Sequence, residues 1–447
     1  MKNSIYIIIA LTLVMFQSCK KDFVEGYDVD PNRPLDVSMD VLLSSAQAYS
    51  SWVTSSDLTR LTGVITQQMT GEDRQFLAIN RYVIAGSDVE TVWEVNAYAG
   101  GLKDLSLLME KADEQTSPHY KGVAQILTAS NLGTLTDCFG DIPYSEALAG
   151  TISDGLEPTY DSQAKIYDAI FQLLDDGIAN VSATSSTLSP GGDDLYLGGD
   201  LTQWAKYANS LKARHYNRLS NTGDYDTEIM NAIAAGFGAG EGATPLFETA
   251  KPQSNPWYQF LVVDRAGYIG LNGYMFDNMT ANNDTLRTAA FGLGGWYFQP
   301  ESPIILVHGC EMLFIEAETM LRTGAADADV QAKLEEAVTS HFGMIALDAS
   351  DYLANDLVDL ASLASEAEKL EAIMWEKYVA SYTTNEAWSD YRRTGYPVLT
   401  AVADAQGGID VPQRLPYPQS EFLYNSNTPT SLEGFPANLT TSLWWAE

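Results

Sequence analysis

The sequence has few of the side chains on which metal sites and disulfide frameworks depend. Its 447 residues include only three cysteines and four histidines, and no two of these have the spacing of metal ligands. The motifs of zinc proteases, phosphate-binding loops and serine hydrolases are also missing. We therefore expect no cofactor, no metal ion and no catalytic residues, and a protein that is not an enzyme.

Basic residues are also scarce. The chain has 25 Lys and Arg against 59 Asp and Glu, which gives a formal net charge of −34. A surface of this sign repels nucleic-acid phosphates and anionic headgroups. The composition excludes a nucleic-acid partner, but it identifies no ligand, because a solvated acidic exterior is common in soluble proteins.

The N-terminus has the pattern of an export signal. Lys2 precedes an apolar run from 5 to 16, which is short for a transmembrane helix, and Cys19 follows directly after Ser18. This arrangement predicts a lipoprotein signal peptide over 1–18, with Cys19 as the lipidated residue. The alternative is an ordinary signal peptide followed by a chance cysteine.

A polar stretch over 19–36 reads as a lipid-anchored tether. Asp28, Asp30 and Asn32 alternate as in a calcium loop. Arg33 stands where that loop needs glycine, and Met39 stands where it needs glutamate, so the pattern predicts no metal site.

Amphipathic helices dominate from residue 37 onward and predict one mainly α domain over 37–447. Clear helical periodicity covers 117–135, 161–181 and 307–322, and Ser365 with Glu368 forms a capping box for a helix that reaches 382. Further helices are expected over 40–53, 57–70, 88–114, 201–219, 326–342 and 385–392. Long Gly-, Pro- and aromatic-rich loops are expected over 183–200, 236–260, 282–306 and 395–437.

Two of the cysteines, Cys138 and Cys310, lie far apart in this helical region. An exported protein could pair them, but two buried free thiols fit the sequence equally well.

Several segments, in order, resemble the SusD/RagB family, in particular its second, SusD-like subgroup. They include a Gly-Asp-Ile-Pro-Tyr-Ser-Glu-Ala-Leu element at 140–148. The other similar segments are 28–47, 194–219, 303–322, 386–397 and 414–425, whereas 282–287 departs from the family's usual Asn-Asp-Pro-Arg. The resemblance implies a SusD-like fold with tetratricopeptide-type helix pairs and a ligand face made of long irregular loops. It also implies an outer-membrane lipoprotein that works with a SusC-like TonB-dependent transporter.

Sugar binding needs aromatic rings for C–H faces and polar groups for hydroxyls. Three stretches offer both, at 72–82, 255–260 and 292–299, and the third places rings after three glycines in a flexible backbone. The candidate ligand-binding residues are Trp296, Tyr297, Phe298, Trp257, Tyr258, Asp73, Arg74, Phe76 and Tyr82. The third stretch is the sharpest candidate, and the first is a candidate because the resemblance implies ligand contacts in that region. For each stretch the alternative is that the rings fill the core.

The sequence thus predicts a lipoprotein on the outer membrane, facing the cell exterior. It would capture oligosaccharides and deliver them to a TonB-dependent transporter. Two alternatives stay open. One is a peptide-binding lipoprotein of the same architecture, and the other is a helical-repeat scaffold or adhesin.

Overall fold

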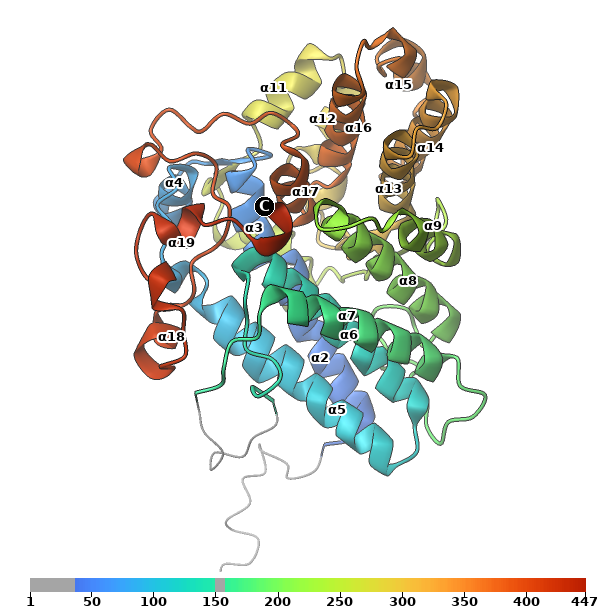
Figure 1. The fold of residues 1–447 in the computed structure, drawn as a ribbon, viewed down its shortest axis with the longest axis vertical. Coiled ribbons are helices and arrows are strands. Elements are labelled where there is room, and N and C mark those ends of the chain that lie inside the picture. Colours follow the sequence, from blue (N-terminus) through green and yellow to red (C-terminus); the bar gives the residue numbers. More distant parts are fainter. Residues whose placement is uncertain (1–36, 149–156) are drawn as a thin grey trace, which may run out of the picture.

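The computed structural model describes residues 37–148 and 157–447. The predicted signal peptide, Cys19 and the tether with its calcium-loop-like aspartates lie outside these residues. Within them the fold is mainly helical, as the sequence predicts, and Figure 1 shows long helices stacked side by side with irregular segments at the edges.

The longer helices are α2 (Met39–Ser55), α3 (Asp57–Ile65), α5 (Lys103–Glu114), α6 (Pro118–Phe139), α7 (Gln163–Val181), α8 (Leu201–Arg218), α9 (Asp226–Ala235), α13 (Gly309–Arg322), α14 (Asp327–Met344), α16 (Glu366–Ala380) and α17 (Glu386–Thr394). A π-helix, η3 (Thr91–Leu102), precedes α5. Shorter helices are α4 (Arg74–Asn80), α10 (Pro256–Tyr258), α11 (Tyr274–Ala281), α12 (Thr285–Phe291), α15 (Ser350–Asn355), α18 (Gln419–Tyr424) and α19 (Ala437–Thr440).

Four two-residue strands form two antiparallel pairs. They are β1 (Thr70–Gly71) with β3 (Ile269–Gly270), and β2 (Gly242–Ala243) with β4 (Val307–His308). Each pair joins segments that are distant in sequence, so the strands serve to fix loops against the helical stack.

Neighbouring helices pack in pairs, α6 with α7, α8 with α9, and α13 with α14, as expected for tetratricopeptide-type repeats. The α6–α7 contact is close because glycines face each other across it. A Cβ on Gly122 would lie 2.8 Å from the Gly177 carbonyl oxygen, and one on Gly177 would lie 2.7 Å from Ile126. Without side chains at these positions the two backbones can approach each other directly.

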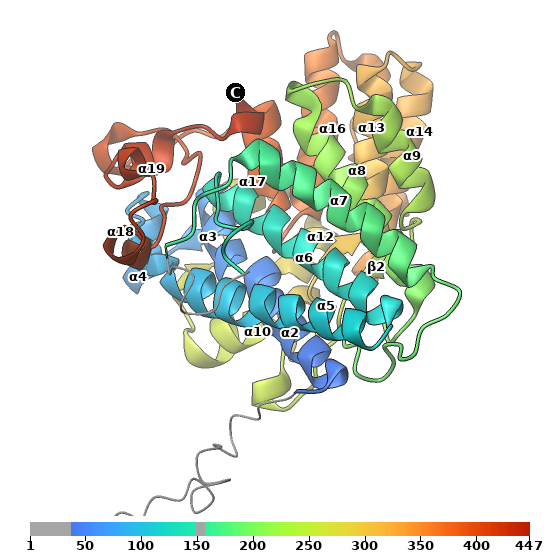
Figure 2. The same ribbon diagram turned by 60° about the horizontal axis from the view of Figure 1, so that its bottom comes forward.

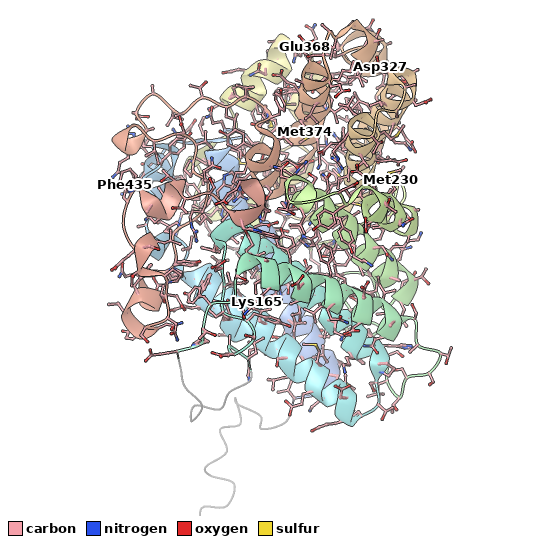
Figure 3. The ribbon with its side chains drawn as sticks, in the orientation of Figure 1. Lys165, Met230, Asp327, Glu368, Met374 and Phe435 are labelled. Carbon is pink, nitrogen blue, oxygen red and sulfur yellow. The ribbon has the colours of Figure 1, made fainter. Side chains whose placement is uncertain are left out.

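Local signals place the helix ends well. The predicted capping box is confirmed, because Ser365 Oγ accepts from Glu368 N at 3.2 Å while Glu368 Oε2 accepts from Ser365 N at 3.0 Å. Asp327 and Glu368 lie at the same end of the molecule (Figure 3), where Lys369 donates to Asp327 at 2.6 Å. This ion pair joins the first turns of α14 and α16.

The sequence prediction was wrong in some segments. The expected loop over 282–306 begins with α12, and the expected loop over 395–437 contains α18. The expected 57–70 helix ends at Ile65. The stretch 282–287 is held by tertiary ion pairs that periodicity cannot reveal: Arg287 Nε donates to Asp284 at 2.6 Å and Arg287 Nη1 to Glu376 at 2.8 Å.

Charged side chains inside the stack need partners of opposite charge. Several of these buried ion pairs involve α8 and α17. Arg218 is buried and lies 3.1 Å from Asp137 and 2.5 Å from Glu386. Lys377 lies 2.8 Å from Asp390. Burial opposes ionisation of Asp390, but the surrounding Lys377, Arg393 and Arg218 outweigh it and lower the pKa of this carboxyl. These groups stabilise the packing of the stack.

Cys138 and Cys310 are both buried free thiols, so they are not paired. Burial raises the pKa of Cys138 to about 12. Among residues 37–148 and 157–447, every helix is too short or too polar to cross a bilayer.

Candidate functional site

The three aromatic-bearing stretches form two groups of rings that meet at Arg60, and we call them together the aromatic cluster. We use this name for the rings of Phe76, Phe260, Tyr268, Trp257, Phe298, Tyr297 and Trp296. The Phe76 and Phe260 ring centroids are 5.3 Å apart, those of Trp257 and Phe298 5.9 Å, and those of Trp296 and Tyr297 4.9 Å. Segments separated by more than two hundred residues of chain therefore meet in one cluster.

Arg60, on α3, joins the two halves of the cluster. Its guanidinium carbon lies 4.3 Å from the Phe260 ring centroid and 5.9 Å from that of Trp257. The side chain is buried, bonded to Asp57 and donating to Ser56 Oγ at 3.0 Å, and burial lowers its pKa. A buried cation against two ring faces holds both rings in place.

Asn255 fixes the second stretch against the third. Its Oδ1 accepts from Trp257 N at 2.8 Å and Tyr258 N at 3.0 Å, which starts α10. Its Nδ2 donates to the Ser302 carbonyl at 2.9 Å. One side chain thus caps the short helix that carries Trp257 and anchors it to the segment after Trp296.

The β1–β3 pair fixes the first stretch. Glu72 N donates to the Tyr268 carbonyl at 2.9 Å, just beyond the paired residues Gly71 and Ile269. A Cβ on Gly71 would lie 1.8 Å from the Phe76 carbonyl oxygen, so α4 folds back tightly on the strand. This brings the Phe76 ring to Phe260.

The predicted residues differ in exposure. Trp296 and Tyr258 are partly exposed, and Asp73 and Arg74 are exposed. The remaining five, each at most 5% exposed, are Trp257, Phe76, Tyr82, Tyr297 and Phe298. Buried rings offer no free face to a ligand in this structure. Four of these five belong to the cluster, whereas Tyr82 is not brought into ring contact with it. Of the predicted rings, Trp296 and Tyr258 are the ones that solvent reaches.

Exposed polar side chains lie beside the β1–β3 pair, next to Tyr268. Asn272 Nδ2 donates to Glu72 Oε1 at 2.7 Å, both side chains are exposed, and Thr70 bonds to the same amide. Such carboxylate and amide groups beside half-buried Phe260 and Tyr268 give the mixture of apolar faces and hydrogen-bonding groups that a sugar needs.

Sequence reasoning missed Arg60, Tyr268 and Asn272. A signal for Tyr268 exists, because it follows Gly267 as Trp296 follows Gly295. Arg60 gives no signal, because its aromatic partners come from distant segments.

Two hollows lie apart from the aromatic cluster. One of 390 Å³ is bordered by Arg393 and Arg322, another of 560 Å³ by His308, and neither includes a residue of the three stretches. In the described part of the chain, no three His, Cys, Asp or Glu side chains gather as metal ligands would.

Comparison with solved structures shows the same fold in known proteins. A SusD/RagB family protein from Bacteroides thetaiotaomicron has a TM-score of 0.76 and 20% identity, covering 92% of this chain and 99% of its own. A chitin-binding protein has a TM-score of 0.74 and 21% identity, covering 92% and 100%. A SusD homolog from Bacteroides uniformis has a TM-score of 0.72 and 22% identity, with the same coverage.

No curated protein matches the chain. Residues 31–294 and 288–418, however, match the sequence model of the SusD-like_2 family, described as "Starch-binding associating with outer membrane". The match covers well over half of the sequence, and the solved structures share the fold over nearly its whole length. The chain therefore belongs to this SusD-like family of starch-binding, outer-membrane-associated proteins.

Proposed function

We propose that this protein is a lipid-anchored, cell-surface binding protein that captures neutral oligosaccharides and delivers them to a SusC-like TonB-dependent transporter. The observation that carries the proposal is the convergence of three aromatic stretches into one cluster with exposed polar groups next to Tyr268. The family description supports glycan as the ligand class and the outer membrane as the location.

Binding rather than catalysis fits this site. Partly exposed Trp296 and Tyr258 would stack on sugar rings, while Asp73, Arg74 and Glu72 would hydrogen-bond to hydroxyls. The rings beneath them, packed on Arg60, keep the surface rigid and so reduce the ordering cost of binding. The ligand would leave intact for the transporter.

The test is calorimetric titration of the soluble protein beginning at Lys20 with malto-, chito- and other oligosaccharides and with mixed peptides. We expect saturable heat from one glycan class and its loss in Trp296→Ala, because the stacking ring is removed. Trp444→Ala is the matched control, since Trp444 is 41% exposed and packs against Tyr167 of α7, far from the cluster in sequence and contacts.

If Trp296→Ala released the same heat of oligosaccharide binding, glycan capture would be retained but the aromatic cluster would be rejected as its site. Heat from peptides alone would replace the ligand class, and heat from no member of the panel would favour a scaffold role. Delivery is tested separately, by glycan uptake in cells that carry the full-length variants. Uptake that does not depend on Trp296 would contradict the proposed transfer.

A further inference from the structure

A second hollow, of 560 Å³, lies between α14, β4 and the glycine-rich loop 238–242. Figure 2 labels β2, which begins at the end of this loop, below α9. The volume of the hollow is within the range of about 300–1,000 Å³ for ligand pockets. It shares no residue with the aromatic cluster.

One face of α14 forms a wall of this hollow. Glu336, Thr339, Ser340, Gly343 and Met344 line it, and their spacing of three, four, seven and eight residues places them along one side of the helix. Ser340 Oγ donates to the Ala239 carbonyl and ties the helix to the loop. The wall is therefore fixed in place.

The floor carries an imidazole with one free polar atom. His308 is 7% exposed and its Nδ1 accepts from Cys310 N at 3.1 Å, capping α13. A neutral ring that accepts at Nδ1 holds its proton on Nε2. Nε2 makes no hydrogen bond to the described residues, and His308 lines the hollow. Solvent reaches Nε2, so its N–H is available to a ligand that accepts from it.

Glycines keep the hollow open. A Cβ on Gly240 or on Gly343 would have nothing within 4 Å. By contrast, a Cβ on Gly309 would lie 1.9 Å from the Gly238 carbonyl oxygen, so the loop is pressed against the start of α13 elsewhere. Gly240 and Gly343 thus leave room in the hollow on its loop side and on its α14 side.

The charges of the lining favour a neutral ligand. Glu336 is its charged residue, and Lys333 lies 2.7 Å from that carboxylate. An anion would find no unpaired cation, and a cation would have to displace Lys333. One imidazole and one carboxylate are fewer ligands than a zinc site requires. Ala239, Met344 and the glycine Cα atoms offer C–H surface, while Thr339 and Glu336 offer hydroxyl and carboxylate partners.

We propose that this hollow binds one neutral, hydroxyl-bearing ring of the size of a single sugar residue, as a site separate from the aromatic cluster. His308 Nε2 donates to a ring or hydroxyl oxygen, Glu336 accepts from a hydroxyl, and the apolar wall contacts the C–H face. The proposal goes beyond oligosaccharide capture at the cluster and does not depend on it.

The experiment follows the His308 side-chain nitrogens by NMR in ¹⁵N-histidine-labelled protein beginning at Lys20, titrated with glucose and with N-acetylglucosamine. We expect a saturable shift of Nε2 with one of these sugars. Gly343→Phe should remove the shift, because it places a ring in the hollow from a helical position without a clash. Gly343→Ala is the matched control and should retain it, as should Trp296→Ala.

A second variant tests the donor itself. His308→Asn keeps a side-chain acceptor for Cys310 N but removes Nε2. In saturation-transfer NMR it should weaken sugar binding about tenfold, the value of one hydrogen bond. Absence of a saturable shift with both sugars, or a shift that persists in Gly343→Phe, would overturn the proposal. Loss of glycan binding in Trp296→Ala with the His308 shift intact would show that the two sites are independent.

Discussion

Asp194 shows how one buried carboxylate organises a loop. It is 4% exposed, and its Oδ1 accepts from Gln47 Nε2 at 2.6 Å and from Tyr196 N at 3.0 Å. Its Oδ2 accepts from Gly199 N at 2.8 Å and from Trp204 Nε1 at 2.7 Å. The residue joins α2, the 194–200 loop and α8, so its role is structural.

For Asp194→Asn we expect the free energy of unfolding to fall by about 3 kcal/mol, because an amide NH₂ would face donors now bonded to the carboxylate. Urea denaturation measures this. Exposed Asp176→Asn, whose carboxylate accepts from Gln172 one turn earlier in α7, is the control and should change stability by less than about 0.5 kcal/mol. Equal effects at the two positions would contradict the interpretation.

His308 also makes stability depend on pH. Burial lowers its pKa from 6.5 to about 4. The unfolded chain therefore binds a proton that the folded chain does not between these values, so stability falls as pH decreases through this window. His215 and His341 act in the same direction, because burial followed by nearby positive charge lowers the pKa of both.

Each such histidine contributes a slope of up to about 1.4 kcal/mol per pH unit. We expect the free energy of unfolding to fall from pH 6.5 towards pH 4.5, and the slope in His308→Asn to be smaller by one proton. Denaturation series at several pH values measure it. A slope unchanged by the substitution would show that His308 titrates normally in the folded protein.

At the scale of elements, glycine has two opposite roles within helices. Gly122 sits where α6 touches α7, and an added Cβ would lie 2.7 Å from Val181. Gly343 sits in the last turn of α14 with open space beside it. The same change to alanine therefore has opposite consequences at the two sites.

Gly122→Ala should lower the free energy of unfolding by about 1–3 kcal/mol, because the helices must separate. Gly343→Ala should raise it by up to about 1 kcal/mol, because alanine is the better helix former. Thermal and urea denaturation of both variants provide the measurement. The same sign at both positions would mean that helix propensity, not packing, decides at α6.

The three aromatic stretches show how elements determine a site. The β1–β3 pair, the Asn255 cap of α10 and Arg60 on α3 each fix one part of the cluster. None of these three supports is one of the aromatic residues that the sequence analysis named as candidates. Positioning at this site depends on such supporting residues, which have no pattern of their own.

At the scale of the whole molecule, the expected location depends on residue Cys19. We expect the full-length protein to partition into the detergent phase of Triton X-114, and Cys19→Ser to stay in the aqueous phase, because lipidation requires the thiol. Cys138→Ala is the control, since this thiol is buried and unpaired. Detergent partitioning of Cys19→Ser would mean that another part of the chain attaches it to the membrane.

The sequence by itself determined the helices, the cap at Ser365 and the family, because these depend on neighbours within a few residues or on an ordered set of motifs. It indicated which stretches carry rings, but not which rings a ligand could reach. Trp296 and Tyr297 are adjacent in a short helical turn, yet one is partly exposed and the other is 2% exposed.

Only the tertiary structure decided between them. Tyr297 packs edge-on against Phe291 and Tyr382, with ring centroids 5.1 and 5.2 Å away, whereas Trp296 lies at the edge of the cluster. Burial depends on which distant segments fold over a side chain, and local periodicity in the sequence does not indicate those segments. The meeting of 72–82, 255–260 and 292–299, and the hollow beside His308, are consequences of that packing.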